Sequence, residues 1–259
     1  MSFVYRVEGN TAYTEPCAAG PWDPNLQHGG AVAALVSRVA ERMSTREPMQ
    51  VARLTLDLLR PVPIAPLEID AQVVREGRKI QLCAITLLHG KVPVARASVL
   101  KVRRASLSLP ETVVEEPVRL PGPEQGHPPA WPFNFEHSFV HGFNLSVVKG
   151  KFGEPGPAAI WFRAHRPIIE GEAITPLMRA VTAGDFCNGA STVLDFNQYT
   201  FINADLTVSL ARLPVGEWVL LDATTWLGDA GTGIAFARLA DERGYFGRAI
   251  QTLVIERRK

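Results

Sequence analysis

The chain has 259 residues, 46% of them hydrophobic, which is enough to bury one large core or two smaller ones. Its 27 basic and 26 acidic side chains nearly cancel, and they are interspersed along the sequence. This balance disfavours a nucleic-acid partner or an anionic membrane surface, and no apolar run of roughly 18 residues suggests a membrane span.

The three cysteines lie far apart in apolar contexts, without the spacing of a disulfide framework or a metal site; they are Cys17, Cys83 and Cys187. They are typical of reduced, buried side chains. The N-terminus lacks a basic segment followed by a long apolar run, so no secretion signal is expected. We therefore expect a cytoplasmic protein that holds no metal and no other cofactor.

The first half has the pattern of a hairpin, one helix and four strands. Weak alternation over residues 3–15 predicts the hairpin, and turn-forming residues at 20–25 predict a loop. Apolar residues then recur at helical spacing from Ala31 to Met43. The expected strands cover residues 51–59, 67–76, 79–89 and 92–103. Because tight turns connect them, the sheet should be antiparallel.

A proline-rich segment, residues 105–132, separates this half from the next and predicts an extended linker. The second half, 133–259, repeats the order of elements in the first half. It opens with residues 133–137, has a second candidate strand at 158–165, and has a helix that begins about Thr175 and ends near Gly189. The strands expected after this helix cover residues 201–211, 217–227, 232–241 and 245–256.

Two segments of the chain are alike. Residues 53–60, RLTLDLLR, are matched by residues 205–212, DLTVSLAR, and each half ends in a pair of arginines. We therefore predict one small α+β unit present twice, at 1–104 and 133–259. The aligned position holds Arg53 in the first copy and Asp205 in the second. Such a difference is expected where only one copy has kept a functional site.

Short motifs in both halves resemble one family, the tandem-hotdog acyl-CoA thioesterases of the thioesterase II type. The motifs are Trp22, Gln27-His28-Gly29-Gly30, Arg60-Pro61-Val62, Asn203-Ala204-Asp205, Glu217-Trp218-Val219-Leu220-Leu221 and Ala249-Ile250-Gln251. Taken in order, these motifs span nearly the whole chain outside the linker. The resemblance implies two tandem hotdog units, each a long helix wrapped by a curved antiparallel sheet, with the sheets joined side by side.

The resemblance also implies an enzyme that hydrolyses acyl-CoA, or a similar acyl thioester, to free acid and thiol with an activated water. Asp205 is the first candidate for the general base, because an ungapped strand places it on a polar face where a carboxylate could deprotonate a water. Gln251 lies among apolar neighbours on the last strand, where a buried amide needs partners and could orient that water.

The family adds a hydroxyl to this water site. An ungapped comparison places it on Trp226, which leaves a choice between the adjacent Thr224 and Thr225, and we take Thr225. Asp185, late on the second helix, is the alternative general base, since some single-unit hotdog thioesterases carry the catalytic carboxylate on the helix. It could equally cap or tie the end of that helix.

The first helix offers a site for the substrate carbonyl. At a helix N-terminus the amides of Gly29 and Gly30 would point outward and stabilise an oxyanion, although glycines there also allow close packing on the sheet. His28 comes directly before these glycines, and we expect it to belong with them to the site that binds the carbonyl. His28 is not expected to act as a general base, because no acidic residue stands at a sequence spacing that would orient its ring.

Two other functions remain open from the sequence. One is a hotdog hydratase or dehydratase of enoyl or hydroxyacyl thioesters, which needs a histidine facing an acid. The other is a non-catalytic acyl-CoA-binding protein. In each case the expected partner is an acyl-CoA, with no nucleic acid and no membrane, and a homo-oligomer (dimer or higher) is compatible with the sequence. Acyl length, the thiol carrier and catalytic competence are left open.

Overall fold

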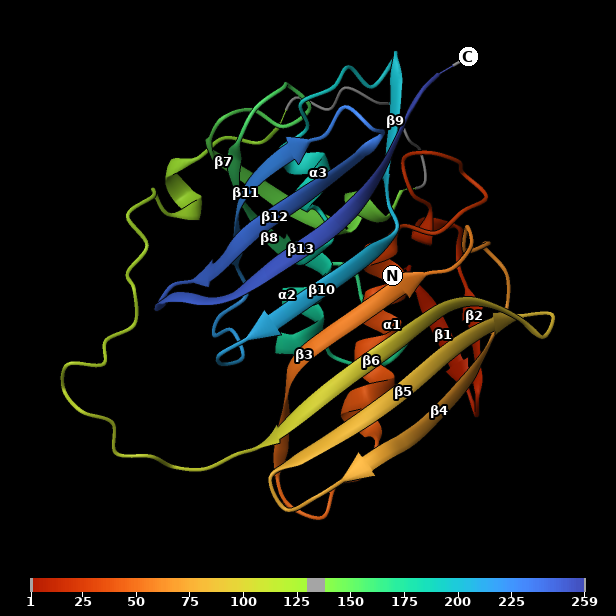
Figure 1. The fold of residues 1–259 in the computed structure, drawn as a ribbon, viewed down its shortest axis with the longest axis vertical. Coiled ribbons are helices and arrows are strands. Elements are labelled where there is room, and N and C mark those ends of the chain that lie inside the picture. The colour runs from red at the N-terminus through yellow and green to blue at the C-terminus, as the bar shows by residue number, and fades with distance from the viewer. Residues whose placement is uncertain (1, 130–137, 259) are drawn as a thin grey trace.

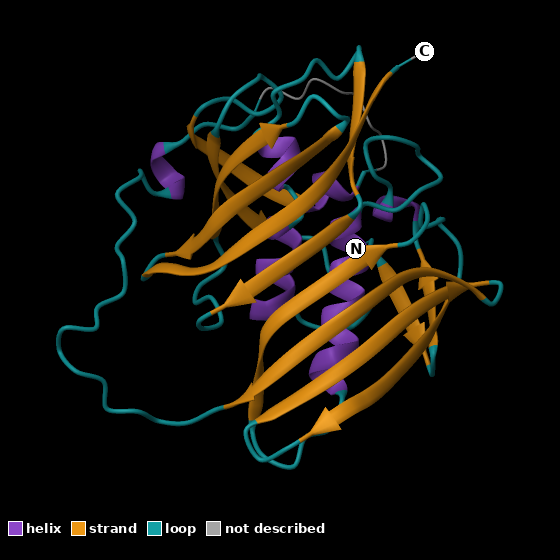
Figure 2. Cartoon of the chain, viewed as in Figure 1, coloured by secondary structure: helices purple, strands orange, loops and turns teal. Residues whose placement is uncertain are grey.

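The computed structural model of the chain describes residues 2–129 and 138–258. Within these residues a 13-stranded sheet of antiparallel strands carries the two longer helices on one of its faces (Figures 1 and 2). No helix in the described part is long and apolar enough to cross a membrane.

The first half contains the elements expected from its sequence. After the hairpin of β1 (Tyr5–Glu8) and β2 (Thr11–Thr14) come the short 3-10 turn η1 (Pro16–Ala18) and α1 (Gly29–Arg42). The four strands are β3 (Met49–Leu58), β4 (Leu67–Glu76), β5 (Ile80–His89) and β6 (Val92–Arg103). Their bounds confirm the predicted hairpin, helix and strands to within about two residues, as element boundaries allow.

The second half opens with η3 (Phe139–Gly142), β7 (Phe143–Lys149) and β8 (Ala158–Ala164). Two helices, α2 (Pro176–Gly184) and α3 (Cys187–Ala190), and two strands, β9 (Tyr199–Asn203) and β10 (Asp205–Leu210), follow. The chain then forms β11 (Val219–Leu227), β12 (Thr232–Asp241) and β13 (Gly244–Arg257).

The second half differs from the sequence pattern in three places. Strand β7 was not predicted. The single helix expected to end near Gly189 is instead divided at Asp185, which forms the C-cap of α2. The strand expected over 201–211 is interrupted at Ala204, because its backbone carbonyl accepts from Leu58 of β3 while its amide donates to Thr252 of β13. The predicted boundary at 132/133 and the opening strand candidate at 133–137 lie outside the described residues.

The two halves meet through β3 and β10. The strand order is β1-β2-β4-β5-β6-β3 and then β10-β13-β12-β11-β8-β7, with β9 beside β13, so the second half mirrors the first. At the centre of the joint Thr55 faces Thr207, and their hydroxyl oxygens lie 3.1 Å apart. These threonines also correspond in the sequence repeat, so an approximate two-fold axis passes between them.

The N-terminus of α1 lies against the C-terminus of α2. A Cβ atom added to Gly29 would be 2.8 Å from Oδ1 of Asp185. Only glycine therefore lets the two helix ends come this close without displacing the Asp185 side chain. At the start of α2, the hydroxyl of Thr175 accepts from the amide of Met178, and Pro176 occupies the first turn, which favours a helix start. Helix packing therefore brings residues from both halves to one point.

The described part of the linker, residues 105–129, runs outside the sheet and contains only the short turn η2 (Pro123–Gln125) (Figure 1). It is attached to the second half by specific contacts. Glu115 accepts from Arg212 at 3.0 Å and from Arg243 at 2.7 Å, and the indole of Trp161 donates to the carbonyl of Pro121 at 2.9 Å. The linker thus covers part of the outer face of the second half.

Asp241 holds the end of β12 and should contribute strongly to stability. Burial alone would raise its pKa, but hydrogen bonds from Arg212 and from the amides of Val215 and Arg243 outweigh this and lower it. Asp241→Asn should lower the free energy of unfolding by about 2–4 kcal/mol, because it leaves the Arg212 guanidinium without its buried partner. Urea denaturation of the two proteins at neutral pH measures the difference.

The exposed pair Lys151–Glu154 provides the control for this substitution, because both side chains are more than half exposed. Glu154→Gln should change stability by less than about 0.5 kcal/mol. Since the folded pKa of Asp241 is depressed, its contribution is complete above the pKa of an unfolded aspartate and is lost as pH falls through the folded value. An equal loss in both variants, or a loss that grows in acid, would contradict this account.

Candidate active site

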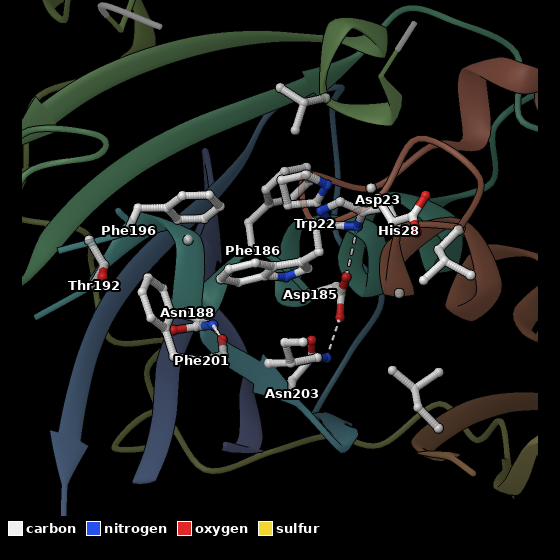
Figure 3. Close-up of a pocket in the computed structure, with 18 of the residues that line it drawn as sticks. Trp22, Asp23, His28, Asp185, Phe186, Asn188, Thr192, Phe196, Phe201 and Asn203 are labelled. Atoms are coloured by element: carbon white, nitrogen blue, oxygen red, sulfur yellow. Dashed lines mark hydrogen bonds and ion pairs between the residues drawn. The ribbon is translucent and has the colours of Figure 1, made fainter. Parts of the chain in front are cut away.

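A cavity of about 980 Å³ lies where α1 and the end of α2 meet the loops before α1 and after α3. Much of its lining is aromatic: Trp22 stacks on Phe196 at 4.4 Å, and Phe201 packs edge-on against Trp22 at 5.2 Å. The polar residues His28 and Asp185 line the same cavity (Figure 3). An apolar cavity with a few converging polar groups is the usual form of a small-molecule site.

The loop before α1 is held in place by Gln27. Its side-chain oxygen accepts from the phenol of Tyr5, and its amide donates to the carbonyl of Pro63 at 2.7 Å and to the hydroxyl of Thr14 at 3.2 Å. Burial raises the pKa of Tyr5 well above its usual value, so the phenol stays protonated and remains a donor. This anchoring fixes His28 at the N-cap of α1.

His28 and Asp185 form a close pair across the two halves. Nδ1 of His28 lies 2.9 Å from Oδ2 of Asp185 and 3.0 Å from the amide nitrogen of Gly30. One nitrogen cannot serve both contacts at once. When Nδ1 carries a proton it donates to the carboxylate and leaves the Gly30 amide free; when it carries a lone pair it caps the helix.

Asp185 is surrounded by donors although only 6% of its surface is exposed. Oδ1 accepts from the side-chain amides of Asn203 and Gln251, each at 3.0 Å. Gln251 also donates to the backbone carbonyl of Asp185 at 2.9 Å, and its own oxygen accepts from the amide of Asn188 at 3.0 Å. The carboxylate is therefore fixed in position by residues from β9 and β13, with the positive end of the α1 dipole facing it.

The two glycines at the start of α1 are closely packed against their surroundings, and Gly29 lies against this carboxylate. A Cβ atom on Gly29 would lie 2.8 and 2.9 Å from the two oxygens of Asp185, and one on Gly30 would lie 3.0 Å from the ring of Phe139. The backbone amide of Gly29 has no hydrogen-bond acceptor among the described residues. A free backbone donor beside a buried carboxylate suits an oxygen atom of a bound ligand.

The structure brings together some of the residues singled out in the sequence and separates others. Gln251, His28, Gly29, Gly30 and Asp185 converge within hydrogen-bonding or contact distance. The pairing of Asp185 with Gln251, rather than of Asp205 with Gln251, is the main departure from the arrangement expected from the sequence.

Asp205 does not line the cavity, although its neighbours Asn203 and Ala204 do. Its Oδ1 accepts from the amide of Thr252 on the adjacent strand. Thr225 is buried, and its hydroxyl pairs with that of Ser191 at 2.8 Å, whereas Thr224 faces the other side of β11. Neither threonine lines the cavity.

Asn203 was not among the candidate residues, yet it contacts Asp185 directly. An ungapped strand would place Asn203 and Asp205 on the same face. The interruption at Ala204 separates them, and nothing in the sequence around Ala204 marks that interruption. The partner of His28 was also missed, because the acid that faces it lies in the other half of the chain.

Cys187 lies two residues beyond Asp185 and is fully buried. Burial, with the nearby Asp185 carboxylate as a second cause, raises the pKa of this thiol far above its usual value. A thiol in this state is a poor nucleophile at neutral pH, so the geometry does not favour covalent catalysis by Cys187. The described residues contain no cluster of His, Cys, Asp and Glu that could hold a metal ion.

Two family models match the sequence. The acyl-CoA thioesterase N-terminal domain matches residues 18–102, and the acyl-CoA thioesterase C-terminal domain matches residues 111–255. No curated protein matches the chain.

Solved structures from bacteria resemble the fold over most of its length. A conserved protein with a hot dog fold from Alicyclobacillus acidocaldarius has a TM-score of 0.73 at 16% identity, covering 97% of this chain and 95% of that one. The TesB protein of Mycobacterium avium subspecies paratuberculosis has a TM-score of 0.71 at 13% identity, with coverage of 97% and 95%. The acyl-CoA thioesterase II TesB2 of Mycobacterium marinum has a TM-score of 0.66 at 15% identity, with coverage of 89% and 90%. At these identities the likeness shows a hotdog fold.

Proposed function

The chain belongs to the acyl-CoA thioesterase family, and from this premise we propose that it hydrolyses acyl-CoA with a water molecule activated by Asp185. The observation that carries the proposal is the hydrogen-bonded group of His28, Asp185, Asn203 and Gln251, which opens into the large cavity. Thioester hydrolysis itself follows from the family; the assignment of steps to residues is our inference.

We infer that the fold consists of two hotdog units in tandem, residues 1–104 and 133–259, with the linker at 105–132. In each unit a helix packs against a curved sheet, α1 in the first and α2 in the second. The first unit supplies His28, Gly29 and Gly30, and the second supplies the carboxylate and the two carboxamides. One composite site at the junction is supported by the direct contact of His28 with Asp185.

The thioester carbonyl is placed on the amides at the start of α1. The Gly29 amide is the first donor, and the Gly30 amide becomes the second when Nδ1 of His28 donates to Asp185. Both amides would strengthen their bonds as negative charge develops on the carbonyl oxygen in the transition state. Because a side chain at position 29 would collide with Asp185, this geometry depends on glycine there.

The attacking water is placed on Asp185, and hydrogen bonds from Asn203 and Gln251 fix the carboxylate that receives it. Asp185 takes a proton from the water as the oxygen–carbon bond forms, and the carbon–sulfur bond then breaks. The proton passes to the departing thiolate, so the products are a free acid and a thiol. A cofactor is not required by this sequence of steps.

Asp185 is preferred to Asp205 as the general base for two reasons. Of these two carboxylates only Asp185 lines the cavity, and it lies beside the helix N-terminus that would bind the carbonyl. Asp205 is already engaged by the Thr252 amide at the start of β10. Thr225 has no corresponding role in this mechanism, since its hydroxyl is bound to Ser191 away from the cavity lining.

A second candidate function is favoured by the same pair. A hydratase or dehydratase of enoyl or hydroxyacyl thioesters needs a histidine facing an acid, and His28 faces Asp185 at 2.9 Å. Release of free thiol separates the two reactions, because hydration leaves the thioester intact. A protein that only binds acyl-CoA would show saturable binding with neither reaction.

The cavity should favour uncharged acyl chains. Its lining is mostly apolar, and among the described lining residues the only lysine or arginine is Arg60, which is exposed and donates to the carbonyl of Pro93 at 2.7 Å. Thiol release from a panel of acyl-CoAs should therefore show higher kcat/KM for neutral chains than for dicarboxylyl-CoAs. A dicarboxylyl-CoA hydrolysed faster than every neutral chain would contradict this assignment of the cavity.

The two candidate carboxylates can be compared directly. Asp185→Asn keeps the shape of the side chain but removes the proton acceptor, so kcat should fall by about 100-fold or more while KM stays within a few-fold. Asp205→Asn is the matched control on the strand beside the cavity and should have a much smaller effect. Steady-state kinetics of both variants, with thermal melts to verify folding, tests the choice. An active Asp185→Asn beside an inactive Asp205→Asn would assign the base to Asp205.

A further inference from the structure

The outer face of the sheet in the second half, which is turned away from α1 and α2, carries exposed apolar side chains. In Figure 1 the strands lie in front of these helices, so the outer face is toward the viewer. Trp226 on β11 is 61% exposed and Val254 on β13 is 50% exposed, while Ile250 and Ile202 are each 42% exposed. Strand pairing places all four on one face around Phe236, against which Trp226 packs edge-on at 4.7 Å. These five residues form the outer patch, and a patch of this kind usually marks contact with another molecule.

The linker covers apolar side chains elsewhere on the same face. Its Val118 and Leu120 pack against a cluster that includes Trp161 of β8 and Leu220 of β11. Strand β11 runs for roughly 20 Å between Leu220 and Trp226, so the outer patch is a separate apolar area. The chain thus buries the apolar side chains at one end of β11 and leaves those at the other end exposed. A partner would be needed to cover them.

The first half has smaller side chains at matching positions. Ile250 corresponds to Ser98, because each of these residues pairs with one of the two matching threonines at the joint between the halves. Their neighbours on the next strand are Phe236 in the second half and Ala84 in the first. Since both halves form the same kind of sheet, the fold alone does not require large apolar groups at these positions.

The surface of the chain is large for its mass. The chain exposes 13202 Å² at 28.3 kDa, whereas a folded monomer of that mass exposes roughly 11,000 Å². The projecting linker and the uncovered sheet face both add to the difference. A stable interface of standard size takes about 800 Å² from each partner, so a dimer contact on this face fits within the excess of roughly 2,000 Å².

The exposed side of β13 has opposite charges at its two ends. Its outward residues, in chain order, are Arg248, Ile250, Thr252, Val254 and Glu256. They span roughly 27 Å, so the arginine and the glutamate are too far apart to pair within one chain. Neither charged side chain forms an ion pair or a hydrogen bond with another described residue. The strand therefore presents a mostly apolar centre between an unpaired cation and an unpaired anion.

A two-fold axis that crosses the strands at Thr252 would make this face complementary to itself. In that arrangement β13 of a second copy runs antiparallel over β13 of the first, at the spacing of roughly 10 Å between packed sheets. Arg248 of each copy then faces Glu256 of the other. Trp226 and Ile234, which share a row with Thr252, meet their own counterparts at the axis. An axis along β13 would instead set Arg248 against Arg248.

We propose that the outer patch is a homodimer interface, in which two copies of this chain pack sheet to sheet about that two-fold axis and form two Arg248–Glu256 ion pairs. The occupant is a second copy because the charges and the apolar row match themselves, as a symmetric interface requires. Ile202 and Val254 also line the cavity of the proposed active site, so the second copy lies at one edge of that cavity.

Sedimentation of the full-length protein tests the proposal. At roughly 10 µM the unmodified protein should have twice the 28.3 kDa mass of one chain, because interfaces of standard size bind at micromolar Kd or tighter. Arg248→Glu should raise the dimer Kd at least about 10-fold, because acidic side chains would then face each other at both ends. The double variant Arg248→Glu/Glu256→Arg exchanges the two charges and should return the Kd to within about three-fold of the original value. This rescue is expected only where the partner is a second copy in this orientation.

Arg96→Glu is the matched control, because Arg96 is the exposed counterpart of Arg248 in the first half and lies outside the outer patch. It should leave the Kd unchanged. Trp226→Ser should raise the Kd at least about 10-fold, since a tryptophan at the axis is lost from both copies. Thermal melts establish that every variant is folded.

Three results would each overturn the proposal. One is a single-chain mass for the unmodified protein at that concentration, whatever else binds to the outer patch. Another is a double variant that dissociates as readily as Arg248→Glu alone, which would mean that the two charges do not meet. The third is equal weakening by Arg96→Glu, which would place the interface elsewhere on the sheet.

Discussion

The pairing of β3 with β10 is the constraint on which the rest of the structure depends. It joins two similar halves at Thr55 and Thr207, and it places α1 and α2 on the same face of one sheet. Because the two helices then lie side by side and antiparallel, the first amides of α1 face a carboxylate at the end of α2. A shift of this register would move every side chain at the junction, so the site depends on the same backbone bonds as the fold.

The approximate two-fold symmetry also creates a second junction, which differs from the first. There Thr175, the N-cap of α2, donates to Glu41 at the end of α1 at 2.7 Å, in the place where His28 meets Asp185 at the other end. Around it, Arg38 and Arg42 pair with Glu172 at 2.8 and 3.0 Å. The copies have thus diverged in polarity: ion pairs line one junction, and the other opens into a cavity with aromatic walls.

Much of the fold could be predicted because it rests on local patterns. The alternation of β3 to β6 and the turn residues between them set their bounds, and the two glycines that open α1 mark where it begins. The arrangement of the site was harder to predict from the sequence, because its contacts join residues that are far apart along the chain. The interruption at Ala204 turns Asn203 toward Asp185 and leaves Asp205 outside the cavity, and it arises from hydrogen bonds to β3 and β13 that no local pattern reveals. For the same reason the partner of His28, in the other half of the chain, could not be found from sequence spacing.

The central claim is that groups from both halves act as one catalytic unit. A double-mutant cycle between His28 and Asp185 tests it most directly, using His28→Asn, which keeps a helix-capping side chain, and Asp185→Asn. The measured quantity is kcat/KM for thioester hydrolysis by the unmodified protein, both single variants and the double variant. If the pair acts together, the double variant should be no slower than the slower single variant. Losses that simply multiply would mean that His28 and Asp185 act independently, and the composite site would be contradicted.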